Sequence, residues 1–352
     1  MLRIPGNGAF GLAFFLAVAS FSPLQSAEPD TPSPAPNSAR SRVPLLADDA
    51  AWSRLPETTD SVHGPLPGWA RALVASLPRT TAAMLELDRL YRTSEAFDPR
   101  LRAKLRWVAA RSNCCDYARR YAEADLLRAG GAKRDVEQLE AGARDLPPRE
   151  RAVLTFARKM TEQASSVTDA EVQYLIEEFG EPAVVAMVLQ LAYANFQDRL
   201  LLALGTEIEP VGPLPPLPVQ FAAPPAGQKP EPAVRPERPA AADEAAPAKI
   251  ADTDWLSLSF GQLQDRMEAQ RSRTSRVSVP DWEVARQGLD PQVYPPDRPV
   301  RIKWSLVVLG HQPQLGSAWI KCLRTFGREA NQDRVFEETL FWVITRSLQC
   351  FY

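Results

Sequence analysis

One segment of the chain recurs at its C-terminal end, and this recurrence limits the possible folds more than any other feature. The pattern Trp107-Val108-x-x-Arg111-Ser112-x-x-Cys115-x-Tyr117 returns, after a shift of 235 residues (342 − 107), as Trp342-Val343-x-x-Arg346-Ser347-x-x-Cys350-x-Tyr352. Without any gap, 12 of the 49 positions from Trp69 to Tyr117 are identical at this shift, where average composition gives about three by chance. The sequence therefore predicts a tandem duplication whose second copy, stopping at Tyr352, is incomplete.

Composition divides the rest of the chain around the two copies. Residues 1–27 have a short basic start, an apolar run and a small-residue end, which predict a signal peptide and an exported, periplasmic or extracytoplasmic protein. An uncleaved membrane anchor is the alternative. A Pro-rich disordered tether is expected over 28–47 and a Pro/Ala-rich linker over 210–250. These segments separate a first domain, 48–209, from the N-terminal part of a second, 251–352.

Apolar residues recur at helical spacing in both copies, and no useful stretch alternates with period two, so the predicted fold class is all-α. Thr168 and Glu171 have the spacing of a capping box, and Gly180 is suited to end the helix that they open. The segment from about Pro182 to Leu204 is apolar nearly all round and predicts the buried centre of a bundle. The second copy, lacking further helices, is expected to leave apolar faces uncovered.

Cys115 and Cys350 each stand at a predicted helix start, where free backbone N–H groups and the helix dipole favour a reactive thiolate. The alternative is a small buried apolar side chain. Other chemistries are not indicated. The net charge of −2 gives no footprint for nucleic acid, and the only histidines, His63 and His311, are too far apart for metal-ligand spacing. Phosphate-loop and dinucleotide fingerprints are absent from the sequence, so no metal and no cofactor are predicted.

The run LRWVAARSNCCDYARRYAEADLLRAG, together with the segment from LPPRERAVLTFARKM to Tyr193-x-Asn195-x-x-Asp198-Arg199, resembles the alkylhydroperoxidase D-like, carboxymuconolactone decarboxylase superfamily. The resemblance implies an all-α alkylhydroperoxidase D-like helical bundle that usually forms homo-oligomers. In the redox branch of that superfamily a Cys-x-x-Cys pair at a helix start reduces peroxide. A Glu twelve residues before the first Cys and a His four residues after the second move the protons.

The two copies depart from this pattern to different degrees. In the first copy Cys115 matches the first cysteine, but Ala118, Ala103 and Ala122 stand where the second Cys, the Glu and the His belong. In the second copy Glu338 lies twelve residues before Cys350, at the position of the family's glutamate. Cys350, Glu338 and Cys115 are therefore the candidate catalytic residues.

The resemblance implies an exported, thiol-dependent peroxide-reducing antioxidant protein of the peroxiredoxin type. Its substrates would be a peroxide or other small molecule and a thiol reductant, and its competent site would lie in the second repeat. This chain is expected to be inactive by itself. The first copy would then supply the packing surface that a homo-oligomer normally supplies. The alternative is a non-catalytic helical binding or scaffolding protein that kept the fold and lost the chemistry, and a lactone decarboxylase is the third option.

Overall fold

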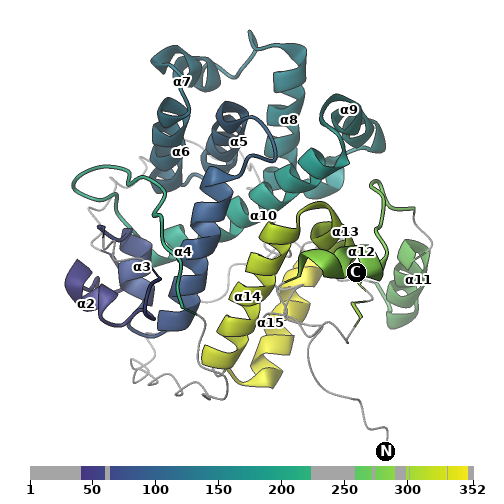
Figure 1. The fold of residues 1–352 in the computed structure, drawn as a ribbon. Helices are drawn as coiled ribbons and strands as arrows, with labels where there is room; N and C mark the ends of the chain where they lie inside the picture. The colour runs from purple at the N-terminus through teal and green to yellow at the C-terminus, as the bar shows by residue number, and fades with distance from the viewer. Residues whose placement is uncertain are drawn as a thin grey trace, which may run out of the picture.

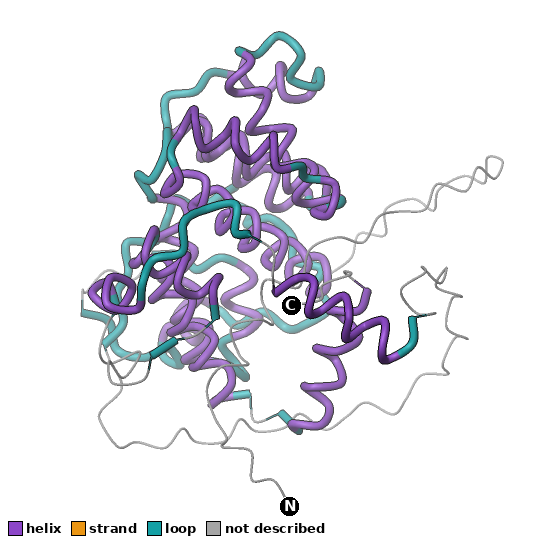
Figure 2. The backbone as a smooth tube through the Cα atoms, turned by 90° about the vertical axis from the view of Figure 1, so that its right-hand side faces the viewer, coloured by secondary structure: helices purple, strands orange, loops and turns teal. Residues whose placement is uncertain are grey.

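A computed structural model describes residues 41–59, 64–222, 258–271, 274–289, 299–300, 302–330 and 332–347. Within these ranges the chain is all-α, as predicted, and Figure 2 shows helices joined by loops without a strand. A single isolated bridge joins Thr58 and Phe221. The predicted signal peptide, residues 28–40 of the tether, residues 223–250 of the linker and Cys350 lie outside the described residues.

Figure 1 shows the order and arrangement of the described helices. The first unit holds α2 (Asp48–Trp52), α3 (Gly68–Leu73), α4 (Pro78–Thr93), α5 (Pro99–Ser112), α6 (Asp116–Arg128), α7 (Lys133–Glu140), α8 (Pro148–Glu162), η1 (Ala164–Ser166), α9 (Asp169–Phe179) and α10 (Glu181–Leu204). After it come α11 (Phe260–Arg271), α12 (Trp282–Ala285), η2 (Arg286–Gly288), α13 (Lys303–His311), α14 (Pro313–Glu329) and α15 (Arg334–Ser347).

Local signals in the sequence fix most of these helix ends. Proline occupies the first turn of α4, α5 and α8, where its missing N–H costs nothing. The predicted capping box is present, since the Thr168 backbone N–H donates to Oε2 of Glu171 at 2.9 Å and the Glu171 N–H donates to the Thr168 hydroxyl at 3.3 Å. Gly180 and Gly205 follow the last residues of α9 and α10, both with positive φ. The helix periods and stop signals were therefore predicted correctly.

Helix α10 is the centre of the first unit, as its all-round apolar sequence predicts. Fourteen of its side chains are buried, among them Met187 and Leu191 at 0% exposure. One face packs with α5, α8 and α9 around Leu105 and Phe156. A second core cluster fills the space between α5, α6, α7 and α8 around Trp107. These two core clusters hold α6 against α5.

Helix α14 packs along α4, so the region after the linker shares a core with the first unit (Figure 1). Trp319 lies at the centre of this contact, with ring centroids 6.3 Å from Tyr91 and 6.1 Å from Tyr193, both edge-on. Lys321 forms an ion pair with Glu86, a residue 235 positions earlier in the chain. At its other end α14 brings the buried Glu329 carboxylate to the first N–H groups of α4.

The first unit continues past the predicted domain boundary at Glu209. Leu214, Val219 and Phe221 are buried against the helices, and the backbone N–H of Ala222 donates to the carbonyl of Glu57 at 2.8 Å. These three apolar side chains lie in a Pro-rich stretch, which is why composition alone assigned them to the linker. The described part of that stretch, 210–222, is therefore packed on the domain.

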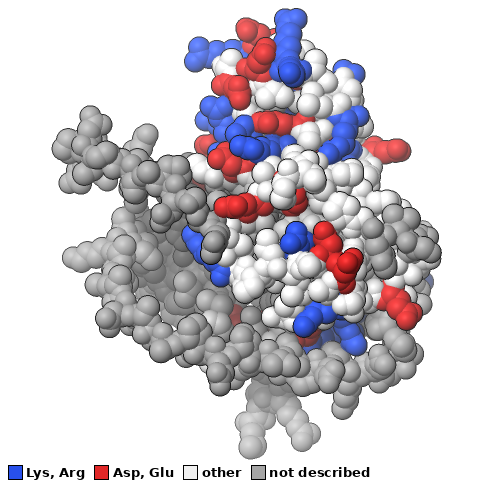
Figure 3. Space-filling model, turned by 90° about the vertical axis from the view of Figure 1, so that its left-hand side faces the viewer, with Lys and Arg blue, Asp and Glu red and all other residues white. Residues whose placement is uncertain are grey.

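The surface carries charges of both signs. On the face seen in Figure 3, Lys and Arg side chains alternate with Asp and Glu side chains, in keeping with a formal net charge of −2. Across the described ranges, no helix combines the length and the apolar character that crossing a membrane requires.

Candidate functional site

A small polar cavity lies between α4, α6 and α10, next to the chain that follows α10. Its free space for the centres of water-sized molecules is about 40 Å³, which is room for about three waters. Ala118 and Ala122, from the first turns of α6, both line it. The resemblance described above would place the second cysteine and the histidine at these two positions, and both are alanines here.

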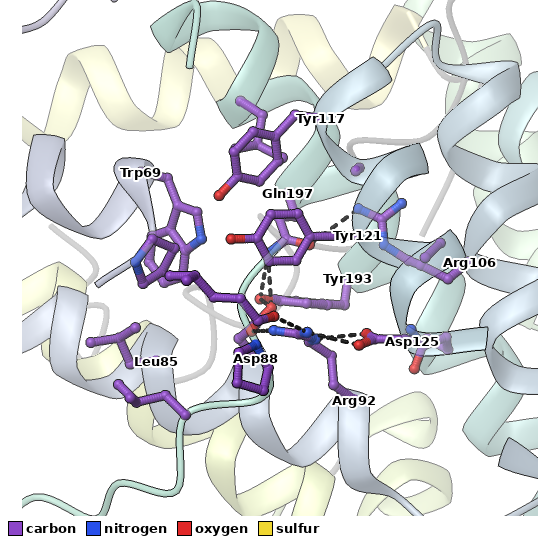
Figure 4. A pocket seen from close by; sticks show the side chains of 18 of the residues that line it. Trp69, Leu85, Asp88, Arg92, Arg106, Tyr117, Tyr121, Asp125, Tyr193 and Gln197 are labelled. Carbon is purple, nitrogen blue, oxygen red and sulfur yellow. Dashed lines mark hydrogen bonds and ion pairs between the residues drawn. The ribbon is translucent and has the colours of Figure 1, made fainter. Parts of the chain in front are cut away.

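An arginine between two carboxylates forms one wall of the cavity (Figure 4). Arg92 donates from Nε and Nη2 to the two oxygens of Asp125, at 2.7 and 2.8 Å, and its Nη1 lies 3.4 Å from Asp88. Burial opposes the charge of Arg92, but these carboxylates more than compensate and raise its pKa. Asp88 also accepts from Tyr193 at 3.0 Å and from Gln197 at 2.9 Å. This wall is a closed network with its charges paired.

A second buried ion pair joins α5 to α10. Arg106 donates to both carboxylate oxygens of Asp198, whose side chain is fully buried, and to Gln197 at 3.1 Å. Asn113 donates to the same carboxylate at 2.9 Å. Burial opposes the charge of Arg106, and Asp198 offsets this so that the pKa of the guanidinium is raised. The pair fixes the C-terminal half of α5, and with it the start of α6.

Two stacked tyrosines on α6 share one carboxylate at the cavity's edge. Tyr117 and Tyr121 lie with ring centroids 4.7 Å apart, and their hydroxyls donate to Glu209 at 2.6 and 2.7 Å. The backbone N–H of Gly68 donates to the same carboxylate at 2.7 Å. Burial, reinforced by the charge of Glu209, raises the pKa of both hydroxyls. Both tyrosines therefore remain neutral at physiological pH.

Gln190 differs from the other polar residues that line the cavity. It is 4% exposed, and among the described residues no hydrogen bond to its carboxamide is found. Among the described residues, the buried side-chain atoms that lack a hydrogen-bond partner belong to Arg89, Arg199 and Thr206 and not to Gln190. Gln190 is therefore a polar side chain of the cavity that carries no penalty for a buried, unpaired atom.

Cys115 stands at the N-cap of α6, where the sequence predicted it, but its thiol is shielded. The residue is 2% exposed, and burial raises the pKa of the thiol to about 12, with the charge of Asp198 adding to the effect. The Ala118 backbone N–H and Arg106 act in the opposite direction. Desolvation thus outweighs the helix N-terminus. Because folding favours the neutral thiol, this contribution to stability is present below the thiol's ordinary pKa and is lost as pH rises towards 12.

Cys114 is the residue at which the chain turns from α5 into α6. Its φ is 55°, its N–H donates to the carbonyl of Arg111 at 3.0 Å, and the next N–H, of Cys115, donates to Ala110 at 2.9 Å. This is the Schellman pattern, which usually places glycine at the left-handed position. A side chain there costs free energy because Cβ crowds the backbone.

We expect Cys114→Gly to raise the free energy of unfolding by about 0.5–1 kcal/mol, since relief of this crowding exceeds the added entropy of the unfolded chain. The matched control Cys114→Ala keeps Cβ and should be close to neutral. Urea titration followed by circular dichroism measures both. A loss of stability in the glycine variant would mean that the cysteine side chain makes a stabilising contact in solution.

Neither Cys115 nor Glu338 is among the residues that line this cavity. Glu338 is exposed on α15, with Oε1 3.7 Å from Nε of Arg334. Cys350 lies outside the described residues, so the structure does not bring it together with Glu338. His311 is the last residue of α13 rather than part of a loop, and its Nε2 lies 3.1 Å from the carbonyl of Ser278. In the described ranges, no cluster of three metal-ligating side chains is found.

Two motif residues have structural roles. Arg111 lies over the ring of Trp107 at 5.3 Å and donates to the carbonyl of Glu140, which accounts for an arginine repeated at this position. Asn195 donates to the carbonyl of Leu191 at 2.9 Å and so satisfies a backbone group, as its place on an apolar helix suggested.

Most of the cavity's polar residues were not singled out from the sequence. Asp88 and Arg92 stand four residues apart on one helix. This spacing indicates an ion pair within the helix and could have been recognised in the sequence. Glu209 follows α10 in an irregular segment, and nothing local marks it as the partner of two tyrosines on α6.

Comparison with protein-family models, with curated proteins and with solved structures gives no match. The geometry of the cavity is therefore the evidence for its chemistry.

Proposed function

We propose that the chain is an exported protein of the alkylhydroperoxidase D-like type whose first unit is a non-catalytic helical binding or scaffolding unit. The observation that carries this proposal is the shielded thiol beside two alanines. Cys115 is buried, and Ala118 and Ala122, at the positions where the resemblance implies the second Cys and the His, line the cavity. A thiol peroxidase cycle needs an accessible thiolate, a second thiol and a proton carrier. In the first unit the Cys115 thiol is shielded, alanines stand at the two implied positions, and the other thiol, Cys114, is exposed at the turn directly before Cys115.

Two features support the idea that the regions before and after the linker are copies of one unit. Helices α14 and α15 begin 235 residues after α4 and α5. The ion pair between Glu86 and Lys321 joins matching positions of α4 and α14. Contacts between matching positions are typical of two-fold interfaces in homodimers. We infer that packing between the repeats replaces a homodimer contact.

Alkylation kinetics test the inert first site. At pH 8 a thiol of pKa about 12 is ionised about a thousand-fold less than an ordinary thiol, so Cys115 should react with iodoacetamide about a thousand-fold more slowly than in the unfolded chain. A Cys114→Ser variant isolates the signal, which peptide mapping by mass spectrometry assigns. The urea-unfolded variant is the matched control. Rapid native alkylation of Cys115, together with its oxidation by stoichiometric peroxide, would overturn the proposal.

A second candidate function is thiol-dependent peroxide reduction in the second repeat, with Cys350 and Glu338 as its catalytic residues and a thiol as reductant. One observation supports this candidate. Glu338 is exposed on α15, the helix that begins 235 residues after α5. Peroxide consumption that survives Cys115→Ser and is lost in Cys350→Ser and Glu338→Gln would establish it. Consumption that is unchanged in both second-repeat variants would exclude it.

A further inference from the structure

Residues 213–218, with the sequence Pro-Leu-Pro-Pro-Leu-Pro, lie along the cavity after α10, and we call them the proline segment. The structure assigns them to neither helix nor strand. Their exposure follows a three-residue period. Leu214 is buried and Leu217 half-buried, and both line the cavity, whereas Pro215 and Pro218 are exposed. Three residues per turn is the period of the polyproline II helix. The segment therefore presents a row of leucines to the cavity.

The main chain of the proline segment is bound by two arginines. A polyproline II helix makes no internal hydrogen bonds, so its carbonyls need outside donors. Arg92 donates from Nη2 to the carbonyl of Leu214 at 2.8 Å, and Arg128 donates from Nη2 to the carbonyl of Pro213 at 2.6 Å. Asp125 holds both guanidiniums, at 2.7 and 2.8 Å from Arg92 and 2.7 Å from Arg128. One carboxylate thus directs donors at two successive carbonyls.

Aromatic rings form the wall beside these donors (Figure 4). The Arg92 guanidinium lies over the ring of Tyr121 at 5.1 Å, and Tyr121 stacks on Tyr117 with ring centroids 4.7 Å apart. Grooves lined with aromatic rings are a recurring means of binding proline-rich segments, because the preformed polyproline II helix loses little entropy when it binds. The groove between α4 and α6 has this chemistry.

The walls of the groove are held by contacts that do not involve the proline segment. The hydroxyls of Tyr117 and Tyr121 donate to Glu209, which precedes the segment and also accepts from the N–H of Gly68. Arg92 is held by its ion pair with Asp125. A groove whose donors and rings are fixed in advance pays little ordering cost when a ligand binds. Removal of residues 213–218 from the groove would leave these contacts in place.

We propose that this groove is a binding site for a proline-rich segment of a partner protein, with leucines three residues apart and prolines beside them. The chain's own proline segment occupies the site in cis and competes with the partner. A segment tethered by a short linker acts at an effective concentration in the millimolar range. The partner therefore binds when the tethered segment is displaced. The inference rests on the proposed function, because it names the partner of the binding unit.

A labelled peptide of residues 210–222 tests the proposal against the full chain, with fluorescence anisotropy as the measurement. The variant Leu214→Asp with Leu217→Asp removes the tethered competitor, since it places charges in the leucine row. We expect this double variant to bind the peptide at least about tenfold more tightly than the parent chain. A peptide that carries the same two substitutions should not bind to either chain.

Arg128 provides a test of the main-chain contact. Its side chain is 37% exposed, so Arg128→Met should leave the fold intact. Introduced into the double variant, it should weaken peptide binding about tenfold, because a charged donor to the Pro213 carbonyl is lost. Arg120→Met is the matched control, since Arg120 is exposed on the same helix and does not line the cavity. It should leave peptide binding unchanged.

Absence of peptide binding in a double variant that keeps the parent's helical circular dichroism would overturn the proposal, as would equal binding of the substituted peptide. Leu217→Ser, at a half-buried position, decides the question if the double variant loses helical signal. It should bind the peptide more tightly than the parent chain does. Sedimentation of the parent as a dimer that the double variant does not form would overturn the proposal in favour of a second copy as occupant.

The alkylation of Cys115 is measured separately on the parent chain. An inert Cys115 without peptide binding refutes only this inference, whereas a reactive Cys115 with peptide binding refutes only the inert first site of the proposed function.

Discussion

Replacing Trp107 with alanine is expected to lower the free energy of unfolding by about 3–5 kcal/mol, whereas the same replacement at Trp342 should change it by less than about 1 kcal/mol. The two residues occupy matching positions of the repeated motif. Trp107 is 2% exposed inside the cluster between α5, α6, α7 and α8, and Trp342 is 57% exposed on α15. Alanine at Trp107 leaves a cavity and removes the hydrogen bond to Glu123, which keeps its ion pair with Arg119. Alanine at Trp342 removes surface that water already reaches.

Urea titration of both variants and of the parent chain, followed by circular dichroism, measures the two losses of unfolding free energy. Trp107→Phe is the matched control, because it keeps most of the ring volume and loses the hydrogen bond to Glu123, and it should cost less than alanine. Large and equal losses at Trp107 and Trp342 would mean that α15 is covered in solution. That outcome would contradict the exposure of Trp342 in the structure.

The contrast between these two tryptophans also shows what a sequence motif determines. The repeated residues predict a helix at both places, because helix formation depends on local spacing, and α5 and α15 do begin at matching positions. Burial depends on which other elements pack against the helix. The residues that cover Trp107 extend along the chain as far as Leu154 of α8. No pattern within the motif distinguishes the covered copy from the exposed one.

For Cys115 the helix start was predicted from the sequence, but the surroundings of its thiol were not. Helix signals placed Cys115 at the N-cap of α6, which the structure confirms. The effect of the helix start on a thiol is local and favours ionisation. The pKa of Cys115 is raised by burial, which desolvates the thiol, and by the negative charge of Asp198 on α10. Non-local burial of this kind is visible only once the helices are packed.

The largest single effect within the site is expected for Asp198→Ala, which should cost about 3–5 kcal/mol of unfolding free energy. Asp198 is fully buried and accepts hydrogen bonds from Arg106 and Asn113. Its removal leaves the Arg106 guanidinium with Gln197 as its remaining acceptor and without a compensating charge. Burying an unpaired cation is far costlier than losing the attraction between the two charges.

A double-mutant cycle separates these contributions. Arg106→Met removes the cation while keeping a long flexible side chain, and Arg106→Met combined with Asp198→Ala removes both charges of the pair. We expect the double variant to be more stable than Asp198→Ala by about 2 kcal/mol or more, because it leaves no unpaired charge. Urea titration of the four chains measures the coupling. Additive losses would show that Asp198 acts mainly through Asn113 and packing. A strong coupling would instead show that the Arg106–Asp198 pair holds the start of α6 in place against α10. The same pair would then also position the wall of the cavity that α6 forms.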